Sequence, residues 1–108
     1  MKAISIISAG TGADLNIPLG FVPDHVKIIN ATTFDVNEMW ADSATIKINQ
    51  QMDASDGVVT TDTDGILMYA GNDGSDGNAK AAKGITLDAS ALSNVNEKVL
   101  VVIAETYV

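Results

Sequence analysis

The sequence predicts one domain over residues 1–108 with an all-β fold, an antiparallel β-sandwich for which the jelly roll is the candidate variant. Short segments rich in Val, Ile and Thr follow one another, and β-branched side chains favour strands over helices. Turns rich in Gly, Asp and Asn separate these segments, with no helix-length segment between them. Aromatic residues make up only 5% of the chain, so its core must be aliphatic.

The N-terminal part predicts two strands followed by a hairpin. Lys2–Ala9 places Ile residues between small polar ones, which is typical of a strand. Asp14–Leu19 alternates strictly, but Pro18 cannot donate to a ladder, so we expect this strand at a sheet edge or a strand end. After a proline turn, His25–Asn30 predicts a strand that pairs with the alternating segment Phe34–Trp40.

The alternation continues in Ala44–Gln50, where we expect Ile46 and Ile48 in the core and Asn49 on the outside. Beyond it the dipeptide Asp-Gly occurs four times, and it is a strong turn signal because both residues tolerate positive φ. These turns lie at 56–57, 64–65, 73–74 and 76–77, and they alternate with two short predicted strands, Val58-Val59 and Ile66–Ala70.

The C-terminal part predicts a long loop and two further strands. Gly71–Lys83 is small and polar throughout, so we expect a long Gly/Asp-rich loop there. Gly84–Leu87 predicts a strand, and Asp88–Leu92 predicts one helical turn capped by Asp88. After a turn at Asn94–Glu97, the segment Val99–Ala104 is apolar on both faces and predicts a central strand covered on both sides.

Charge and composition exclude several classes of partner. The chain has 14 acidic and 6 basic residues, none of them Arg, and a net charge of −8. It lacks the basic surface that binds phosphate, so we expect neither nucleic acid nor an anionic membrane as a partner. No apolar run is long enough to span a bilayer, and the N-terminus does not read as a signal peptide. The absence of Cys fits synthesis in a reducing cytoplasm.

No residue pattern predicts catalysis, so we expect no enzyme activity, no cofactor and no metal. His25 is the only histidine, and we expect it to be structural or exposed because no nucleophile elbow accompanies it. Trp40 is expected as core or interface filler. The spacing of the loop residues does not fit the EF-hand pattern, although a looser calcium site in these loops stays open as an alternative. Its ligands would be Asp62, Asp64, Asp73 and Asp76.

Scattered positions along most of the chain resemble a group of small tailed-phage virion proteins, the capsid decoration (cement) proteins and related accessories. The matching positions are Leu19-Gly20-Phe21, Pro23, Val26, Ile28, Asn30, Trp40, Lys83-Gly84-Ile85-Thr86 and Asn94-Val95-Asn96. The likeness is weakest from Gln50 to Ala79. This resemblance implies a structural protein and no catalytic residues.

The resemblance and the composition together lead to one functional hypothesis and two rivals. We expect a homo-oligomer, with a trimer favoured, because a short chain cannot cover two-faced apolar strands alone. It would bind the major capsid protein on the surface of the virion, at junctions between capsid subunits, after synthesis in a bacterial host. The first rival is a tail or fibre accessory that binds a host glycan or receptor, and the second is a small hydrolase.

Overall fold

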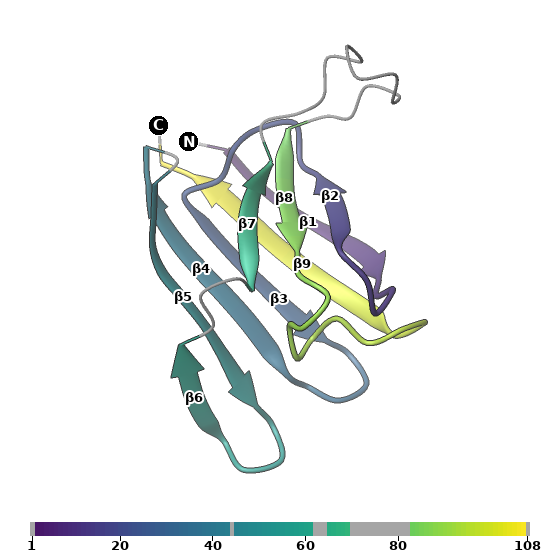
Figure 1. The fold of residues 1–108 in the computed structure, drawn as a ribbon. Coiled ribbons are helices and arrows are strands. Elements are labelled where there is room, and N and C mark those ends of the chain that lie inside the picture. Colours follow the sequence, from purple (N-terminus) through teal and green to yellow (C-terminus); the bar gives the residue numbers. More distant parts are fainter. Residues whose placement is uncertain (1, 44, 62–64, 70–82, 108) are drawn as a thin grey trace.

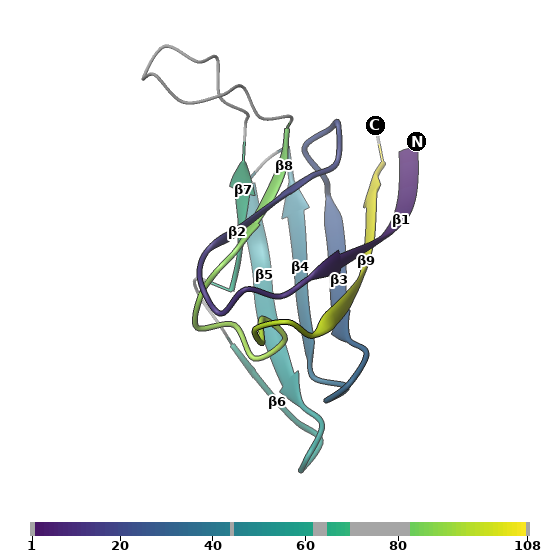
Figure 2. The ribbon, with the colours of Figure 1, turned by 90° about the vertical axis from the view of Figure 1, so that its right-hand side faces the viewer.

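The computed structural model describes residues 2–43, 45–61, 65–69 and 83–107. In these residues the chain forms two antiparallel sheets packed face to face, and it forms no helix, so the predicted all-β sandwich is confirmed (Figures 1 and 2). The jelly-roll variant stays a prediction. The strands are β1 (Lys2–Ala9), β2 (Leu15–Pro18), β3 (His25–Asn30), β4 (Val36–Asp42), β5 (Thr45–Asp53), β6 (Val58–Thr61), β7 (Ile66–Tyr69), β8 (Gly84–Leu87) and β9 (Val99–Thr106).

The larger of the two sheets has six strands in the order β1-β9-β3-β4-β5-β6 and is called the large sheet below. The other, the small sheet, has three strands in the order β2-β8-β7. The predicted hairpin is confirmed, because β3 pairs with β4. His25 lies opposite Trp40 at one end of this ladder, and Ile29 lies opposite Val36 at the other. β2 lies at a sheet edge, as Pro18 predicts, and β9 lies inside the large sheet between β1 and β3.

The hydrophobic core lies between the two sheets and is aliphatic, as the composition predicts. Alternate residues of each strand face inward, which is the period-two pattern of a half-covered sheet. The fully buried side chains of the core are Ile17, Val26, Ile28, Met39, Ile66, Ile85, Leu87, Leu100, Val102 and Ala104. Within the small sheet, β8 lies very close to β2 at Gly84, where an added β-carbon would overlap the backbone of Ile17.

The prediction for the inner face of β5 is wrong at two residues. A bulge interrupts the β4–β5 ladder, because Trp40 pairs with Ile48 whereas Ala41 pairs with Ile46, which leaves Lys47 unpaired. An unpaired residue reverses the side-chain alternation on one side of a bulge. Ile46 therefore packs on the core as expected, but Ile48 is 50% exposed and Asn49 is buried.

The segment before β9 is a series of turns, not the predicted helical turn. The amide of Ala91 donates to the Asp88 carbonyl at 3.2 Å, which closes a single turn, and the Asp88 carboxylate accepts from Ser90. The predicted capping role of Asp88 is thus retained without a helix. The next turn is confirmed, because Lys98 donates to the Val95 carbonyl at 3.1 Å. Of the predicted Gly71–Lys83 loop, only Lys83 belongs to the described residues.

We expect Asn49 to matter more for stability than its apolar neighbour Ile48. The Asn49 amide donates to the Ile66 carbonyl at 2.8 Å, and its oxygen accepts from the Ile66 amide at 3.3 Å, which ties β7 to β5. Replacing Asn49 with Ala leaves these buried groups unpaired and should lower the free energy of unfolding by about 1–3 kcal/mol. The control Ile48→Ala should cost under about 1 kcal/mol, because that side chain is half exposed. Urea denaturation measures both, and equal costs would contradict this account.

Candidate functional site

The large sheet has an outer face that points away from the small sheet and carries an uninterrupted row of apolar side chains. Antiparallel register places one residue of each strand side by side across the sheet. Six apolar residues follow one another in this way, and we call them the apolar row. They are Ile7 (β1), Val101 (β9), Ile29 (β3), Val36 (β4), Met52 (β5) and Val59 (β6).

The apolar row is exposed most at its two ends. Ile7 is 76% exposed and Val59 is 54% exposed, whereas the four residues between them are half-buried by their neighbours. The prediction that Val99–Ala104 is covered on both faces is therefore wrong. β9 is central in the large sheet, but Val99 is 46% and Ile103 is 39% exposed on the outer face. Exposed apolar surface of this extent marks an interaction site more often than a passive surface.

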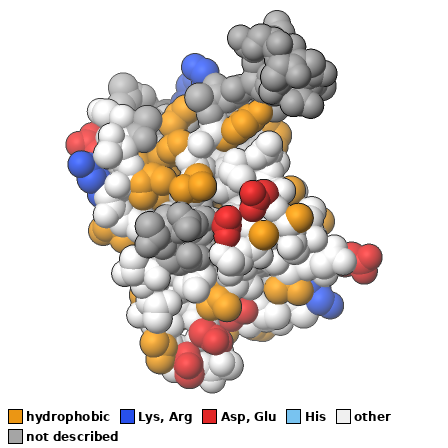
Figure 3. Space-filling view, in the orientation of Figure 1, with side chains coloured by type: hydrophobic (Ala, Val, Ile, Leu, Met, Phe, Trp, Pro, Cys, Tyr) orange, Lys and Arg blue, Asp and Glu red, His pale blue; other side chains and the backbone are white. Residues whose placement is uncertain are grey.

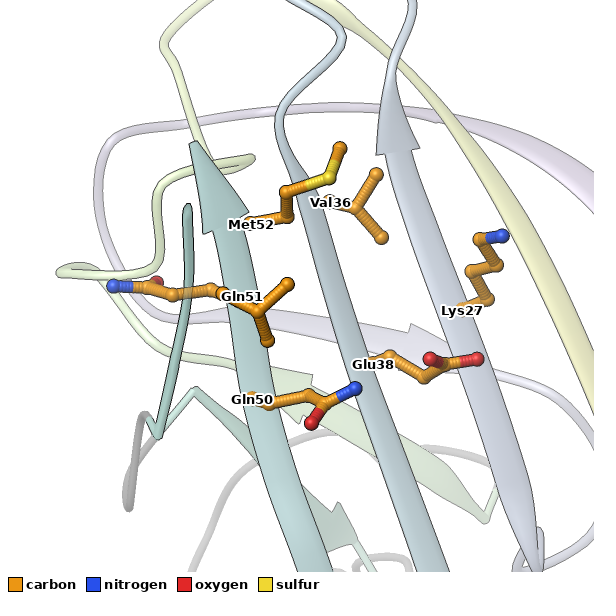
Figure 4. A pocket seen from close by; sticks show the side chains of 7 residues that line it. Lys27, Val36, Glu38, Gln50, Gln51 and Met52 are labelled. Atoms are coloured by element: carbon orange, nitrogen blue, oxygen red, sulfur yellow. The ribbon is translucent and has the colours of Figure 1, made fainter. Parts of the chain in front are cut away.

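A shallow hollow lies on the outer face where the apolar row crosses β4, β5 and β6. It has a volume of about 150 Å³. Val36, Met52 and Val59 form its apolar part, and Lys27, Glu38, Gln50 and Gln51 complete its lining. In Figure 4 the side chains of Lys27 and Glu38 project on the same side of the sheet, next to each other. The hollow is suited to one apolar side chain bordered by polar groups, because it is small and open.

The end of the outer face near the chain termini carries a polar and aromatic group that we call the His25 cluster. Its members are His25, Glu38, Trp40, Glu105 and Tyr107. His25 Nε2 lies 2.7 Å from Glu38 Oε2, and Nδ1 lies 2.9 Å from Glu105 Oε1. The imidazole stacks on Trp40 at 3.9 Å between ring centroids, and Trp40 stacks on Tyr107 at 6.4 Å.

The chemistry of the His25 cluster is that of a closed hydrogen-bond network. An imidazole donates from both nitrogens only when it carries two protons, and both nitrogens here face carboxylate oxygens. Hydrogen bonds from the Tyr107 hydroxyl and from His25 lower the pKa of Glu105. Desolvation and the neighbouring Glu105 carboxylate raise the pKa of Tyr107. The cluster therefore pairs both His25 nitrogens with carboxylate groups, and the raised pKa keeps the Tyr107 hydroxyl protonated at neutral pH.

The sequence predicted part of this arrangement and missed the rest. His25 is buried, which agrees with the structural alternative, but its contacts with Glu38 and Glu105 are not predicted by the sequence. Glu38 and Glu105 lie far apart in the chain and meet only because β4 and β9 both pair with β3. Trp40 is 37% exposed on the outer face and is not a core residue. Because both His25 nitrogens contact carboxylates, neither is left to activate a serine hydroxyl.

The described residues include no group of three or more His, Asp or Glu side chains that could hold a metal ion. The alternative calcium ligands Asp62, Asp64, Asp73 and Asp76 lie outside the described residues. Within the described part of the chain, no helix is long and apolar enough to cross a membrane. No protein-family model, curated protein or solved structure matches this chain.

The lowered pKa of Glu105 predicts how the His25 cluster responds to acid. A carboxyl group whose pKa is lower in the folded state stabilises the fold fully above its unfolded pKa. That contribution is lost as the pH falls through the folded pKa. We therefore expect Glu105→Gln to lower the melting temperature at pH 7, and the gap to the wild type to narrow below about pH 4.

The control for this pH titration is Glu97→Gln, which changes an exposed glutamate in the turn before β9. The difference in melting temperature between this variant and the wild type should be small at pH 7, because the side chain is exposed. Melting curves across the pH titration measure both variants. A Glu105→Gln gap that stays constant into acid would contradict the role of the Glu105 carboxylate.

We expect calcium to leave the stability of the protein unchanged. Asp-Gly pairs are explained by turn geometry, as the described pair Asp56-Gly57 illustrates, where Gly57 has a φ of 71°. A site at a hundred times its dissociation constant would add about 2.7 kcal/mol and raise the melting temperature by about 10 °C or more. Melting with excess calcium and with chelator measures this, and a shift of that size would establish a metal site.

Proposed function

We propose that this protein is a structural virion protein that decorates a phage capsid and stabilises it by binding at junctions between capsid subunits. The observation that carries the proposal is the apolar row, which runs across all six strands of the outer face. Such a surface suits binding between proteins and offers no obvious cleft for a small substrate. The His25 cluster supports the same choice, because its acid and base groups contact one another.

The positions that resemble the phage proteins are those that build the sandwich and its turns. Gly20 adopts a φ of 83° at the turn after β2, and Pro23 is fully buried where the chain enters β3. Asn94 accepts from the amides of Thr11 and Gly12 at 2.9 and 3.2 Å, and it donates to Ala13 and Asp88. A likeness at scaffold positions supports a shared architecture and implies no shared catalytic group.

The proposed mechanism is binding to the assembled shell and not to its dissociated subunits. A ligand with that preference stabilises the assembled state by mass action. Many identical contacts on one particle add up, and a homo-oligomer gains avidity, with the trimer favoured from sequence as the working hypothesis. β1 offers a further contact, because it is an edge strand of eight residues beside the C-terminal strand β9. The net charge of −8 would keep decorated particles apart.

One observation favours the rival function, a tail or fibre accessory that binds a host glycan. Trp40 and Tyr107 are exposed by 37% and 51%, and they stack beside the carboxylates of Glu38 and Glu105. Aromatic faces next to hydrogen-bonding groups are what sugar binding requires. We rank this function second because, among the described residues, only Trp40 and Tyr107 form an exposed aromatic stack, and the exposed Phe34 lies apart from them in the β3–β4 turn.

The proposed function predicts that the protein makes mature phage heads harder to rupture. Particles of the phage that carries the gene are stripped of the protein, heated and compared with particles to which it has been added back. Re-decorated heads should release their DNA at a higher temperature, and binding should survive moderate salt because apolar contacts are not screened. An unrelated acidic protein of similar size is the control. Equal release temperatures would refute the capsid role, and labelling of the tail tip in electron micrographs would favour the rival.

A further inference from the structure

We infer that the outer face of the large sheet binds a second copy of this chain, face to face, about a two-fold axis that runs parallel to the strands between β3 and β4. This inference deepens the proposed function, because it assigns the apolar row to contacts between copies and leaves surfaces outside the row, such as the edge strand β1, to the capsid. The inference concerns self-association of the purified protein, so the protein could be a monomer in solution and still bind phage heads. It rests on three features of the outer face: its area, its apolar row and its charges.

The apolar row is complementary to itself under this symmetry. A two-fold axis between β3 and β4 exchanges β1 with β6, β9 with β5, and β3 with β4. Ile7 of one copy then lies opposite Val59 of the other, Val101 opposite Met52, and Ile29 opposite Val36. Every apolar residue of the row therefore meets an apolar residue.

The shape of the two ends of the apolar row fits the same arrangement. Ile7 has the largest exposed fraction of the large hydrophobic residues that the structure describes, and it projects from the edge strand β1. Val59 lies at the other end of the row, beside Met52, in the hollow that Figure 4 shows from close by. The symmetry places the Ile7 side chain of each copy against Val59, at the β6 edge of the other copy's hollow. The two-fold symmetry forms this contact twice, once at each end of the apolar row.

The charges of the outer face are also complementary under this symmetry. Lys27 and Glu38 are cross-strand neighbours in the row adjacent to the apolar row. Because the axis exchanges β3 with β4, Lys27 of each copy lies opposite Glu38 of the other. Figure 3 shows acidic and basic side chains on the side of the molecule that carries the small sheet, away from this contact. The two symmetric Lys27–Glu38 pairs offset each other's charge, and Glu105 of the His25 cluster lies toward one end of the face.

The area of the outer face lies near the lower limit of what a specific dimer needs. Its outward side chains form rows of six, six and five residues, with Ala9 and Val99 beyond them, and at a strand spacing of about 4.8 Å they present roughly 600 Å². A stable interface of standard size buries about 800 Å² on each partner. Two large sheets packed in this way have parallel strand directions, which is the aligned packing that twisted sheets adopt. The contact is a dimer contact, and the trimer favoured from sequence would need a second surface.

The test compares two adjacent valines that differ only in the face they occupy. Val59 is 54% exposed on the outer face, and Val58 is 52% exposed on the other face of β6. Sedimentation velocity of the wild type should give twice the 11.2 kDa mass of one chain. Val59→Glu and Ile7→Glu should each raise the dimer dissociation constant at least about tenfold. The matched control Val58→Glu should leave the dimer intact, and circular dichroism checks that all three variants are folded.

A double variant tests the register of the contact. Ile7→Lys combined with Val59→Glu places opposite charges at both contacts of the dimer, so it should associate more tightly than either single variant. The inference is overturned by a wild type that stays monomeric at about 0.1 mM, where specific interfaces of this size associate. It is equally overturned by a trimer, by a dimer that Val59→Glu leaves intact, or by equal dissociation of Val58→Glu. If heads still bind a monomeric wild type, the inference fails and the proposed function stands.

Discussion

The register of β9 between its two neighbours is the constraint on which the rest of the structure depends. β9 is hydrogen-bonded to β1 on one side and to β3 on the other, with continuous pairing along both. This register places Leu100, Val102 and Ala104 in the core. A slip of one residue would exchange the two faces of the strand, because side chains alternate with a period of two. The apolar row and the contact between His25 and Glu105 both follow from this pairing.

Buried asparagine side chains fasten the connections to this sheet. Asn37, near the start of β4, accepts from the amide and hydroxyl of Ser93 at 3.0 and 2.6 Å. Asn30, at the end of β3, donates to the Ser93 carbonyl at 3.0 Å. These bonds satisfy polar groups that would be costly to leave unpaired in the core. They hold the segment before β9 against β3 and β4 and thereby support the register of β9.

The unequal sizes of the two sheets decide how the surface is used. The small sheet covers only one face of the large sheet, and the β5–β6 hairpin extends beyond it (Figure 1). The outer face is left with two parts, the apolar row and the His25 cluster. The cluster fixes one end of this face through contacts among its own members. Both proposals rest on this partly apolar face, because apolar surface of this kind suits binding between proteins.

Alternation, turn residues and composition by themselves determined the all-β class, the strands, the β3–β4 hairpin and the edge position of β2, because these depend on neighbours in sequence. Tertiary structure alone decided which residues of β5 are buried beyond the bulge. An unpaired Lys47 puts Asn49 inside and Ile48 outside, and no local pattern marks that bulge. It also decided the partners of His25, since Glu38 and Glu105 are separated from it by 13 and 80 positions. Such contacts depend on strand order and register, which short-range propensity does not encode.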